Sequence, residues 1–446
     1  MKQGGLSNDD TETSESLSIS GDMDNIQLTD EVIPDPYCDQ EHPVVITFND
    51  VSAAAFKIKG GIEKTPCTLS QMSKQYDMNL YFKKDFLQFT GSFKERGARY
   101  TLLQLSQDQA QTGVIAASAG NHALALAYHG NLLNIPVTVV MPVSAPMMKV
   151  GACKQYGAKV IVIGKDFGEA KQYAMLLSRE KHVLYVNGYD HPHVLAGQGT
   201  MGLEIIEQVP HLDACIVPVG GGGLIAGTAV ALKSLKPSVQ IIGVESERAT
   251  GFQAALAAGK PVYSHVGQTL ADGLAVPVVG VNALATARPL IDRMLTVKES
   301  NIALAILHLV EQEKAVVEGA GAVGLAAIIQ GLLPELKGKS VVITLGGGNI
   351  DTTALGRVLE RGLATEGRLV RFAVIVSDRP GSMAELTKII ADMGVSIKEL
   401  IHERSWQQTD AFSVSVRCLV ETRDMEHAKK LEAELHQHYE DVKFYL

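Results

Sequence analysis

The chain has 446 residues, of which 46% are apolar and 20% charged, and its five cysteines form no C-x-x-C pair. This composition excludes a disulfide scaffold and a zinc knuckle, and no apolar run approaches the roughly 20 residues that span a bilayer. The net charge of −9 comes from residues 1–42, which hold eleven acidic residues and one lysine, so the rest of the chain has no basic footprint for nucleic acid. We expect a cytoplasmic protein of two or three domains, with neither a nucleic-acid nor a membrane partner.

Changes in composition along the chain predict four segments. Residues 1–44 are acidic and poor in large apolar side chains, which predicts a disordered tail. Residues 45–360 form the main domain, with a smaller subdomain inserted at approximately 90–190. Residues 361–369 are polar enough to be a linker, and residues 370–446 form a separate small domain.

The main domain shows short apolar runs separated by helical stretches. Strands are expected, in chain order, at 113–117, 135–141, 159–163, 214–219, 240–245 and 340–345. Helices are expected from His122, through 149–156 and from Leu224. Continuous apolar strands joined by helices predict parallel sheets that are covered on both faces, and hence an α/β fold.

The C-terminal segment has a different pattern. Its expected elements are a strand at 371–377, a helix at 382–393, strands at 395–403 and 411–420, a helix at 425–438 and a strand at 442–446. This βαββαβ order predicts a small split-βαβ sandwich.

Four consecutive glycines follow the strand at 214–219 and open the next helix; they are Gly220, Gly221, Gly222 and Gly223. Successive glycine N–H groups can converge at the positive end of a helix, which favours a bound phosphate. A tight turn without a ligand is the alternative. The spacing Gly221-x-Gly223-x-x-Ala226, with Glu245 24 residues after Gly221, also fits a dinucleotide fingerprint loosely. An NAD-dependent enzyme therefore stays open at this point.

A lysine at the expected start of a helix argues for a different cofactor. Lys94 lies in the segment 90–98, where the helix dipole disfavours a positive charge. Such a lysine loses its proton easily and can form a Schiff base with an aldehyde cofactor. An isolated lysine usually lies on the surface, but this one accompanies a polar turn at 118–122 and a second glycine turn at 344–349.

The motifs S-F-K-E-R-G-A, S-A-G-N-H, G-G-G-G-L, A-D-G-L and G-G-G-N-I-D occur in this order. In them the chain resembles the fold type II pyridoxal-phosphate enzymes over about residues 45–360, and within these it is similar to the threonine/serine dehydratases and serine racemase. Residues 378–386 resemble the first loop and helix of an ACT-type regulatory domain. The resemblance implies dehydration of L-threonine or L-serine to a 2-oxo acid and ammonia, with control through the ACT-like domain.

The resemblance also implies roles for individual residues. Lys94 would hold pyridoxal 5'-phosphate and then act as the base on the substrate Cα, Phe93 would pack on the pyridine ring, and Asn121 would bind its phenolic oxygen. The phosphate would be held by Gly220, Gly221, Gly222, Gly223 and Leu224. The substrate carboxylate would be bound by the turn that contains Ser118, Ala119, Asn121 and His122.

Three positions differ from or qualify the family pattern. Gly346 stands where a serine or cysteine usually contacts the ring nitrogen. Glu245 and the carbonyl of Ala249 match a cation site of the racemases, but Gly251 replaces an expected Asp, so a divalent or monovalent cation is only an option. Ala119 replaces the serine that returns a proton in the racemases. Ala119 therefore favours elimination, and Ala119→Ser is predicted to add D-serine formation.

Two further expectations concern residues outside the main motifs. Asp272 and Glu318 could tune the cofactor or be purely structural. The turn formed by Arg379, Pro380, Gly381 and Ser382 is the expected effector site of the ACT-like domain, with a role in oligomerisation only as the alternative. A homodimer or homotetramer is expected.

Overall fold

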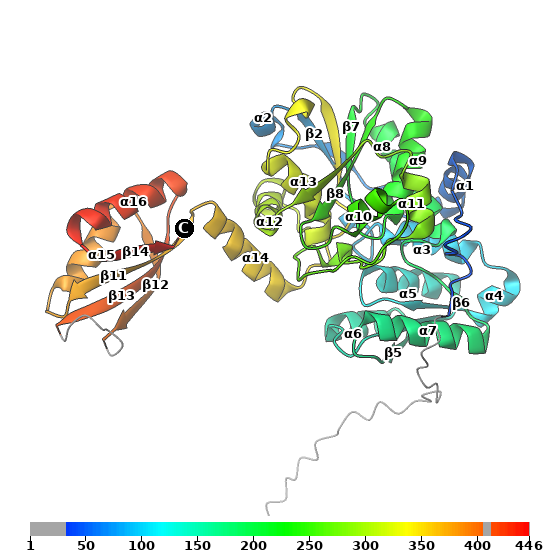
Figure 1. Cartoon of the computed structure of the whole chain (residues 1–446), viewed down its shortest axis with the longest axis horizontal. Coiled ribbons are helices and arrows are strands. Elements are labelled where there is room, and N and C mark those ends of the chain that lie inside the picture. The colour runs from blue at the N-terminus through cyan, green and yellow to red at the C-terminus, as the bar shows by residue number, and fades with distance from the viewer. Residues whose placement is uncertain (1–32, 405–411, 446) are drawn as a thin grey trace, which may run out of the picture.

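The computed structural model describes residues 33–404 and 412–445, and the predicted tail at 1–32 lies outside this range. A large body contains two sheets, and a smaller body lies to one side of it, joined through helix α14 (Thr352–Thr365; Figure 1). None of the described helices is both long and apolar enough to cross a membrane.

The larger sheet has the strand order β1-β2-β10-β7-β8-β9, with only β1 antiparallel to its neighbour. Its strands are β1 (Cys67–Leu69), β2 (Asn79–Lys83), β7 (Ala214–Pro218), β8 (Gln240–Ser246), β9 (Arg293–Val297) and β10 (Ser340–Thr344). Neighbouring side chains of β7 enter different cores: Cys215 packs with one cluster and Ile216 with the other. Both faces of the sheet are therefore buried, as continuous apolar strands predict.

Helices cover both faces of this sheet. On one face lie α1 (Phe48–Ile58), α8 (Pro192–Gln208), α9 (Gly223–Leu235) and α11 (Val281–Ala287). On the other face lie α12 (Glu299–Glu313) and α13 (Gly319–Ile329). The other helical elements of this part are α2 (Ser73–Tyr76), α10 (Gly251–Ala258) and the 3-10 turns Asp85–Leu87, Asp272–Leu274 and Pro334–Leu336.

The smaller sheet of the large body is entirely parallel, with the order β5-β4-β3-β6. Its strands are β3 (Val114–Ala117), β4 (Val137–Met141), β5 (Lys159–Val162) and β6 (Leu184–Tyr185). Helices α5 (Asn121–Leu133) and α6 (Met147–Gln155) cover one face, and α7 (Phe167–Lys181) covers the other. Helix α3 (Lys94–Leu103), which α4 (Gln107–Thr112) follows, packs between α5 and α8 and so joins the two sheets.

The C-terminal body has the expected βαββαβ order and an antiparallel sheet ordered β12-β13-β11-β14. Its elements are β11 (Leu369–Ser377), α15 (Ser382–Asp392), β12 (Ser396–Glu403), β13 (Ser413–Glu421), α16 (Met425–His438) and β14 (Val442–Tyr445). The two helices bury one face of the sheet over Phe372, Val374 and Val416. The predicted fold class, an α/β enzyme body with an ACT-like domain, is confirmed.

The structure bears on two predicted boundaries. Helix α14 continues to Thr365 and β11 begins at Leu369, so most of the predicted linker at 361–369 is regular structure. Gly362 explains why, because it lets α14 approach α12 so closely that an added Cβ would lie 3.0 Å from Leu307. Residues 33–44 of the predicted tail lie within the described range, and there Asn282 Nδ2 donates to the Tyr37 carbonyl at 2.6 Å.

Four strands were not expected from the sequence. They are β1, β2, β6 and β9, which are short or lie at or near the edges of their sheets.

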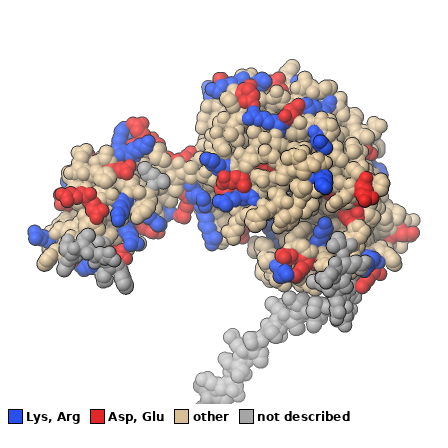
Figure 2. Space-filling view, in the orientation of Figure 1, with Lys and Arg blue, Asp and Glu red and all other residues tan. Residues whose placement is uncertain are grey.

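On the face shown in Figure 2, acidic and basic side chains are interspersed over both bodies. Ion pairs bridge the junction of the bodies: Arg368, directly before β11, contacts Glu311 of α12 at 2.9 Å.

Candidate active site

A cavity of about 730 Å³ opens between the two sheets of the large body. The strands β3, β7 and β10 all end at its wall, and the turns that follow them supply the lining. Ligands of open parallel sheets bind at this carboxyl edge. Of the residues singled out in the sequence, those that line the cavity are Phe93, Lys94, Ser118, Asn121, His122, Gly220, Gly221, Gly222, Gly223, Leu224, Asp272, Glu318 and Gly346.

Lys94 is the first residue of α3 and reaches into the cavity, where its Nζ donates a hydrogen bond to the Gly188 carbonyl at 2.5 Å. Burial disfavours the charged ammonium and lowers the pKa of Lys94 to about 8, although the Glu318 carboxylate partly opposes this shift. Phe93 precedes the helix, and its N–H donates to the Gly346 carbonyl at 2.8 Å. The amine is therefore held in place and is easily deprotonated.

The glycine turn after β7 lies at another part of the cavity wall. Gly222 has φ +96° and Gly223 begins α9, so the N–H groups of the first helical turn face the cavity without helical acceptors. A Cβ at Gly221 would lie 2.3 Å from the Tyr189 ring, and one at Gly220 would lie 2.9 Å from the Leu274 backbone. Side chains cannot be accommodated here, and the turn forms a cup for an anion.

A partly buried hydrogen-bond network joins three turns at the cavity wall. The side-chain amide of Asn121 donates to Glu318 Oε1 at 2.8 Å, and the Asn349 side-chain amide donates to Asn121 Oδ1 at 2.9 Å. These bonds fix the orientation of the Asn121 amide. Burial raises the pKa of Glu318 to about 7, and the hydrogen bond from Asn121 works against this rise.

Glu318 and Asn349 were not assigned to the site from the sequence. The sequence predicts a glycine turn that contains Asn349, and for Glu318 it leaves a structural role and a role beside the cofactor equally open. The available signal was weak: Glu318 precedes a glycine-rich helix start, Gly319-Ala-Gly321, which allows the close approach of another turn. A Cβ at Gly347 would in fact lie 2.3 Å from Glu318 Oε1.

The residues of the turn after β3 do not all face the cavity, although the sequence predicts one substrate-binding turn. Ser118 and Gly120 line the cavity, whereas Ala119 packs against the apolar core of the smaller sheet and is not part of the wall. That Ala119→Ser adds D-serine formation stays a prediction. His122 is buried and its Nε2 contacts the Val186 carbonyl at 3.1 Å; burial lowers its pKa to about 3, which keeps the ring neutral.

Glu245, the residue singled out as a possible cation ligand, lies near the end of β8. Both oxygens of this buried carboxylate accept backbone hydrogen bonds at the start of α10, from Phe252 at 2.7 Å and Gln253 at 3.0 Å. The Ala249 N–H donates to the Ser246 carbonyl in the same turn. No cluster of three or more His, Cys, Asp or Glu side chains suited to a metal occurs in the described ranges.

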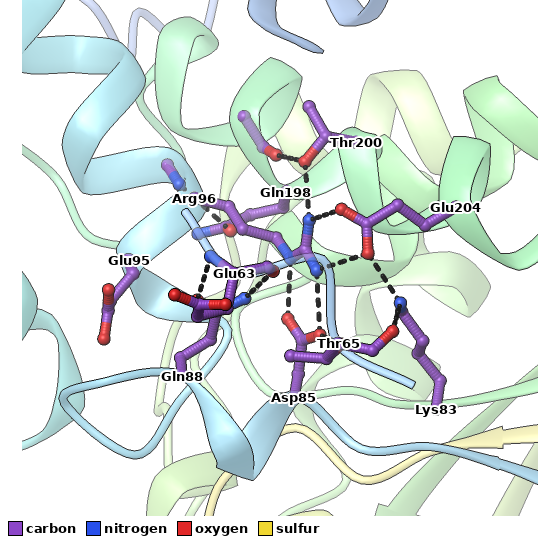
Figure 3. Close-up of polar contacts among 12 residues, drawn as sticks. Glu63, Thr65, Lys83, Asp85, Gln88, Glu95, Arg96, Gln198, Thr200 and Glu204 are labelled. Carbon is purple, nitrogen blue, oxygen red and sulfur yellow. Dashed lines mark hydrogen bonds and ion pairs between the residues drawn. The ribbon is translucent and has the colours of Figure 1, made fainter. Parts of the chain in front are cut away.

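A second buried network, missed from the sequence, holds α3 on the larger sheet (Figure 3). Arg96 makes two contacts with Asp85, at 2.6 and 2.9 Å, and two with Glu204 of α8, at 2.6 and 2.9 Å. Lys83 of β2 contacts the same Glu204 at 2.5 Å. The charges of both signs in this network are thus paired, as buried charges must be. Arg96, at its centre, is two residues after Lys94.

These residues fit pyridoxal phosphate. The Lys94 amine, whose pKa is lowered, shares one cavity with the anion cup of Gly220–Gly223, and side chains at the glycines of this cup would fill it. Residues 58–347 match the family model of pyridoxal-phosphate dependent enzymes, and residues 370–436 match the ACT domain. The chain belongs to the pyridoxal-phosphate dependent enzyme family and carries a C-terminal ACT domain.

Individual relatives are consistent with this family. The chain is 40% identical over 389 residues to an L-threonine ammonia-lyase of Thermotoga maritima, covering 87% of this chain and 96% of that protein. Among solved structures, processed threonine deaminase isoform 2 of Solanum lycopersicum matches with a TM-score of 0.67 and 34% identity, covering 74% of this chain and 98% of that one. Maize serine racemase matches with a TM-score of 0.68 and 31% identity, covering 72% and 99%.

Proposed function

We propose that this protein is an L-threonine/L-serine ammonia-lyase, which converts its substrate to 2-oxobutanoate or pyruvate and ammonia. The observation that carries the proposal is the Lys94 amine, with its pKa lowered to about 8, in the same cavity as the glycine cup of Gly220–Gly223. The relatives named L-threonine ammonia-lyase, at about 40% identity over nearly their full length, support the substrate class.

Each part of the cavity then has a chemical task. Gly220–Gly223 and Leu224 would bind the cofactor phosphate through backbone N–H groups, and Lys94, beside Phe93, would hold the cofactor covalently. When bound, pyridoxal phosphate accepts the negative charge left on the substrate Cα. The Lys94 amine, once free of the cofactor, would remove the α-proton, because its lowered pKa leaves part of this amine neutral at the cavity wall. The β-hydroxyl group would then leave as water with the proton that Lys94 took from Cα, and hydrolysis of the dehydrated product would release the 2-oxo acid and ammonia.

Asn121 and the turn after β3 orient the reactants. We assign the Asn121 amide to the phenolic oxygen of the cofactor, because Glu318 and Asn349 fix the direction in which its N–H groups point. Ser118 and the backbone N–H groups at the start of α5 would bind the substrate carboxylate, since a helix N-terminus favours an anion. Neutral His122 avoids a second positive charge near Lys94.

The test is 2-oxo acid release from L-threonine and L-serine by the wild type and Lys94→Ala, beside an absorption spectrum of each protein. Lys84→Ala is a matched control, since Lys84 lies on the same body but outside the cavity lining. Oxo acid release and the bound-cofactor band, both lost only in Lys94→Ala, support the proposal. A colourless protein that binds a nicotinamide cofactor would overturn it, and a coloured protein that inverts serine without releasing oxo acid would favour the racemase alternative.

The ACT domain is proposed to bind an amino-acid effector through the turn Arg379–Ser382. Gly381, with φ +104°, precedes α15 at this turn. A ligand that binds only the folded domain raises its stability. Heat stabilisation by isoleucine, valine, serine or threonine, lost when residues 370–446 are removed, supports an effector site. If none of these amino acids has an effect, a role in oligomerisation only remains.

We also propose a cytoplasmic location and a homodimer or homotetramer. The cysteines of the described ranges are all unpaired, as in proteins of reducing compartments. Light scattering of the full chain measures the assembly, and a monomer would contradict this part of the proposal.

A further inference from the structure

A buried acid–histidine pair next to Lys94 has no role in the proposed function. Glu95 is the second residue of α3, and His129 lies in the third turn of α5. Glu95 Oε2 and His129 Nε2 are 2.9 Å apart, and the side chains are 2% and 0% exposed. The pair connects two helices whose first residues are Lys94 and Asn121, both in the cavity wall.

The neighbours of the pair determine where its proton lies. Arg99 Nη1 is 3.3 Å from His129 Nδ1, and because a guanidinium can only donate, Nδ1 must accept. The imidazole proton is therefore on Nε2 and is donated to Glu95. The other Glu95 oxygen accepts a hydrogen bond from the Thr90 N–H. An ionised carboxylate with two donors in the first turn of a helix is also favoured by the helix dipole.

Glu95 and Arg96 anchor α3 on opposite sides. Arg96 binds Asp85 and Glu204, which both lie on the side of α3 that faces the larger sheet. Figure 3 shows Glu95 apart from this network. Glu95 instead binds α5, which belongs to the smaller sheet. Lys94 is adjacent to Glu95 in the chain, so this contact between α3 and α5 is one residue from the reactive amine.

We propose that Glu95 and His129 are positioning residues, which set the Lys94 amine against the substrate-binding turn at the start of α5. This inference rests on the proposed function, because it assigns the α-proton transfer to Lys94. Loss of the hydrogen bond leaves a buried carboxylate short of a donor, which costs about 1–3 kcal/mol and forces α3 and α5 to shift. A displacement of about 1 Å in a reacting group can reduce the rate by about 100-fold.

The experiment compares His129→Leu, His129→Gln, Glu95→Gln and the double variant Glu95→Gln/His129→Leu in the full-length holoenzyme. The side-chain amide of a glutamine can still donate to Glu95, whereas leucine cannot. Glu313→Gln is the matched control, because Glu313 is also a carboxylate that accepts a hydroxyl and a backbone N–H, from Ser70 and Gln71, but away from α3 and α5. Melting temperature, kcat, KM and the kinetic isotope effect with α-deuterated threonine are measured.

We expect His129→Leu and Glu95→Gln each to lower kcat by about 10- to 100-fold, with KM changed by less than about threefold and a larger isotope effect. His129→Gln recovers most of kcat. Since the pair acts as a unit, the double variant is no slower than the slower single variant. Glu313→Gln lowers the melting temperature without changing the isotope effect.

An unchanged kcat and isotope effect in both single variants, with a lowered melting temperature, would show that the pair is only structural. A wild type that releases no oxo acid would refute the proposed function instead. The rate at which the cofactor-free protein captures added pyridoxal phosphate then decides the inference, because this reaction needs only a well-placed Lys94. Capture in His129→Leu at the wild-type rate would overturn it.

Discussion

The lowered pKa of Lys94 predicts how the cofactor-free protein reacts with its cofactor as a function of pH. Only the neutral amine attacks an aldehyde, so the capture rate follows the deprotonated fraction of Lys94. Its pKa falls from 10.5 to about 8, mainly because burial disfavours the ammonium. At pH 7 this shift raises the neutral fraction roughly 300-fold, since each pKa unit is a factor of ten.

The perturbation is Glu318→Gln. The Glu318 carboxylate raises the pKa of Lys94, so its removal lowers that pKa further, and the capture rate reaches half its maximum at a lower pH than in the wild type. Glutamine at this position can still accept the hydrogen bond from Asn121. The substitution therefore removes the negative charge and keeps the orientation of the Asn121 amide. Asp166→Asn is the control, because Asp166 also lines the cavity and asparagine can still cap α7.

The assay mixes cofactor-free protein rapidly with pyridoxal phosphate between pH 6 and 10 and follows the absorption band of the covalent product. We expect a midpoint near pH 8 for the wild type and Asp166→Asn, and a lower midpoint for Glu318→Gln. A wild-type capture rate that is still far from its plateau at pH 10, as the ordinary lysine value of 10.5 requires, would refute the electrostatic reasoning, and so would a midpoint that rises in Glu318→Gln.

Three further predictions test the cup, the buried network and the domain junction. Gly221→Ala should weaken cofactor retention at least about tenfold in equilibrium dialysis, because backbone close to a phosphate tolerates no side chain, whereas Gly356→Ala, where a Cβ meets no atom within 4 Å, should not. In urea unfolding, Glu204→Gln should cost about 3–5 kcal/mol by leaving buried charge unpaired, and Glu207→Gln on the same helix, in an exposed ion pair, about 1 kcal/mol or less. Arg368→Gln should keep basal turnover but weaken the activity response to an effector severalfold, since its ion pair with Glu311 joins the start of the ACT domain to α12. An unchanged response would show that this pair carries no coupling.

The sequence alone determined those features that depend on neighbouring residues. Continuous apolar strands indicated parallel sheets, four adjacent glycines indicated an anion cup, and a lysine at a helix start indicated an amine that loses its proton readily. Each is a local property, because strand burial, backbone N–H convergence and the helix dipole involve only a few consecutive residues. The order of these motifs also carried the family resemblance, which the family match confirms.

Only the tertiary structure decided which side chains meet. Glu318 orients Asn121 across 197 residues of chain, and His129 meets Glu95 across 34. The direction of Ala119 depends on how β3 and α5 pack, which the turn sequence does not specify. The C-terminal end of α14 likewise depends on its contact with α12. A polar segment such as this one forms a helix when one of its faces packs against another helix. Long-range contacts of this kind are set by burial in the folded chain, and no local spacing encodes them.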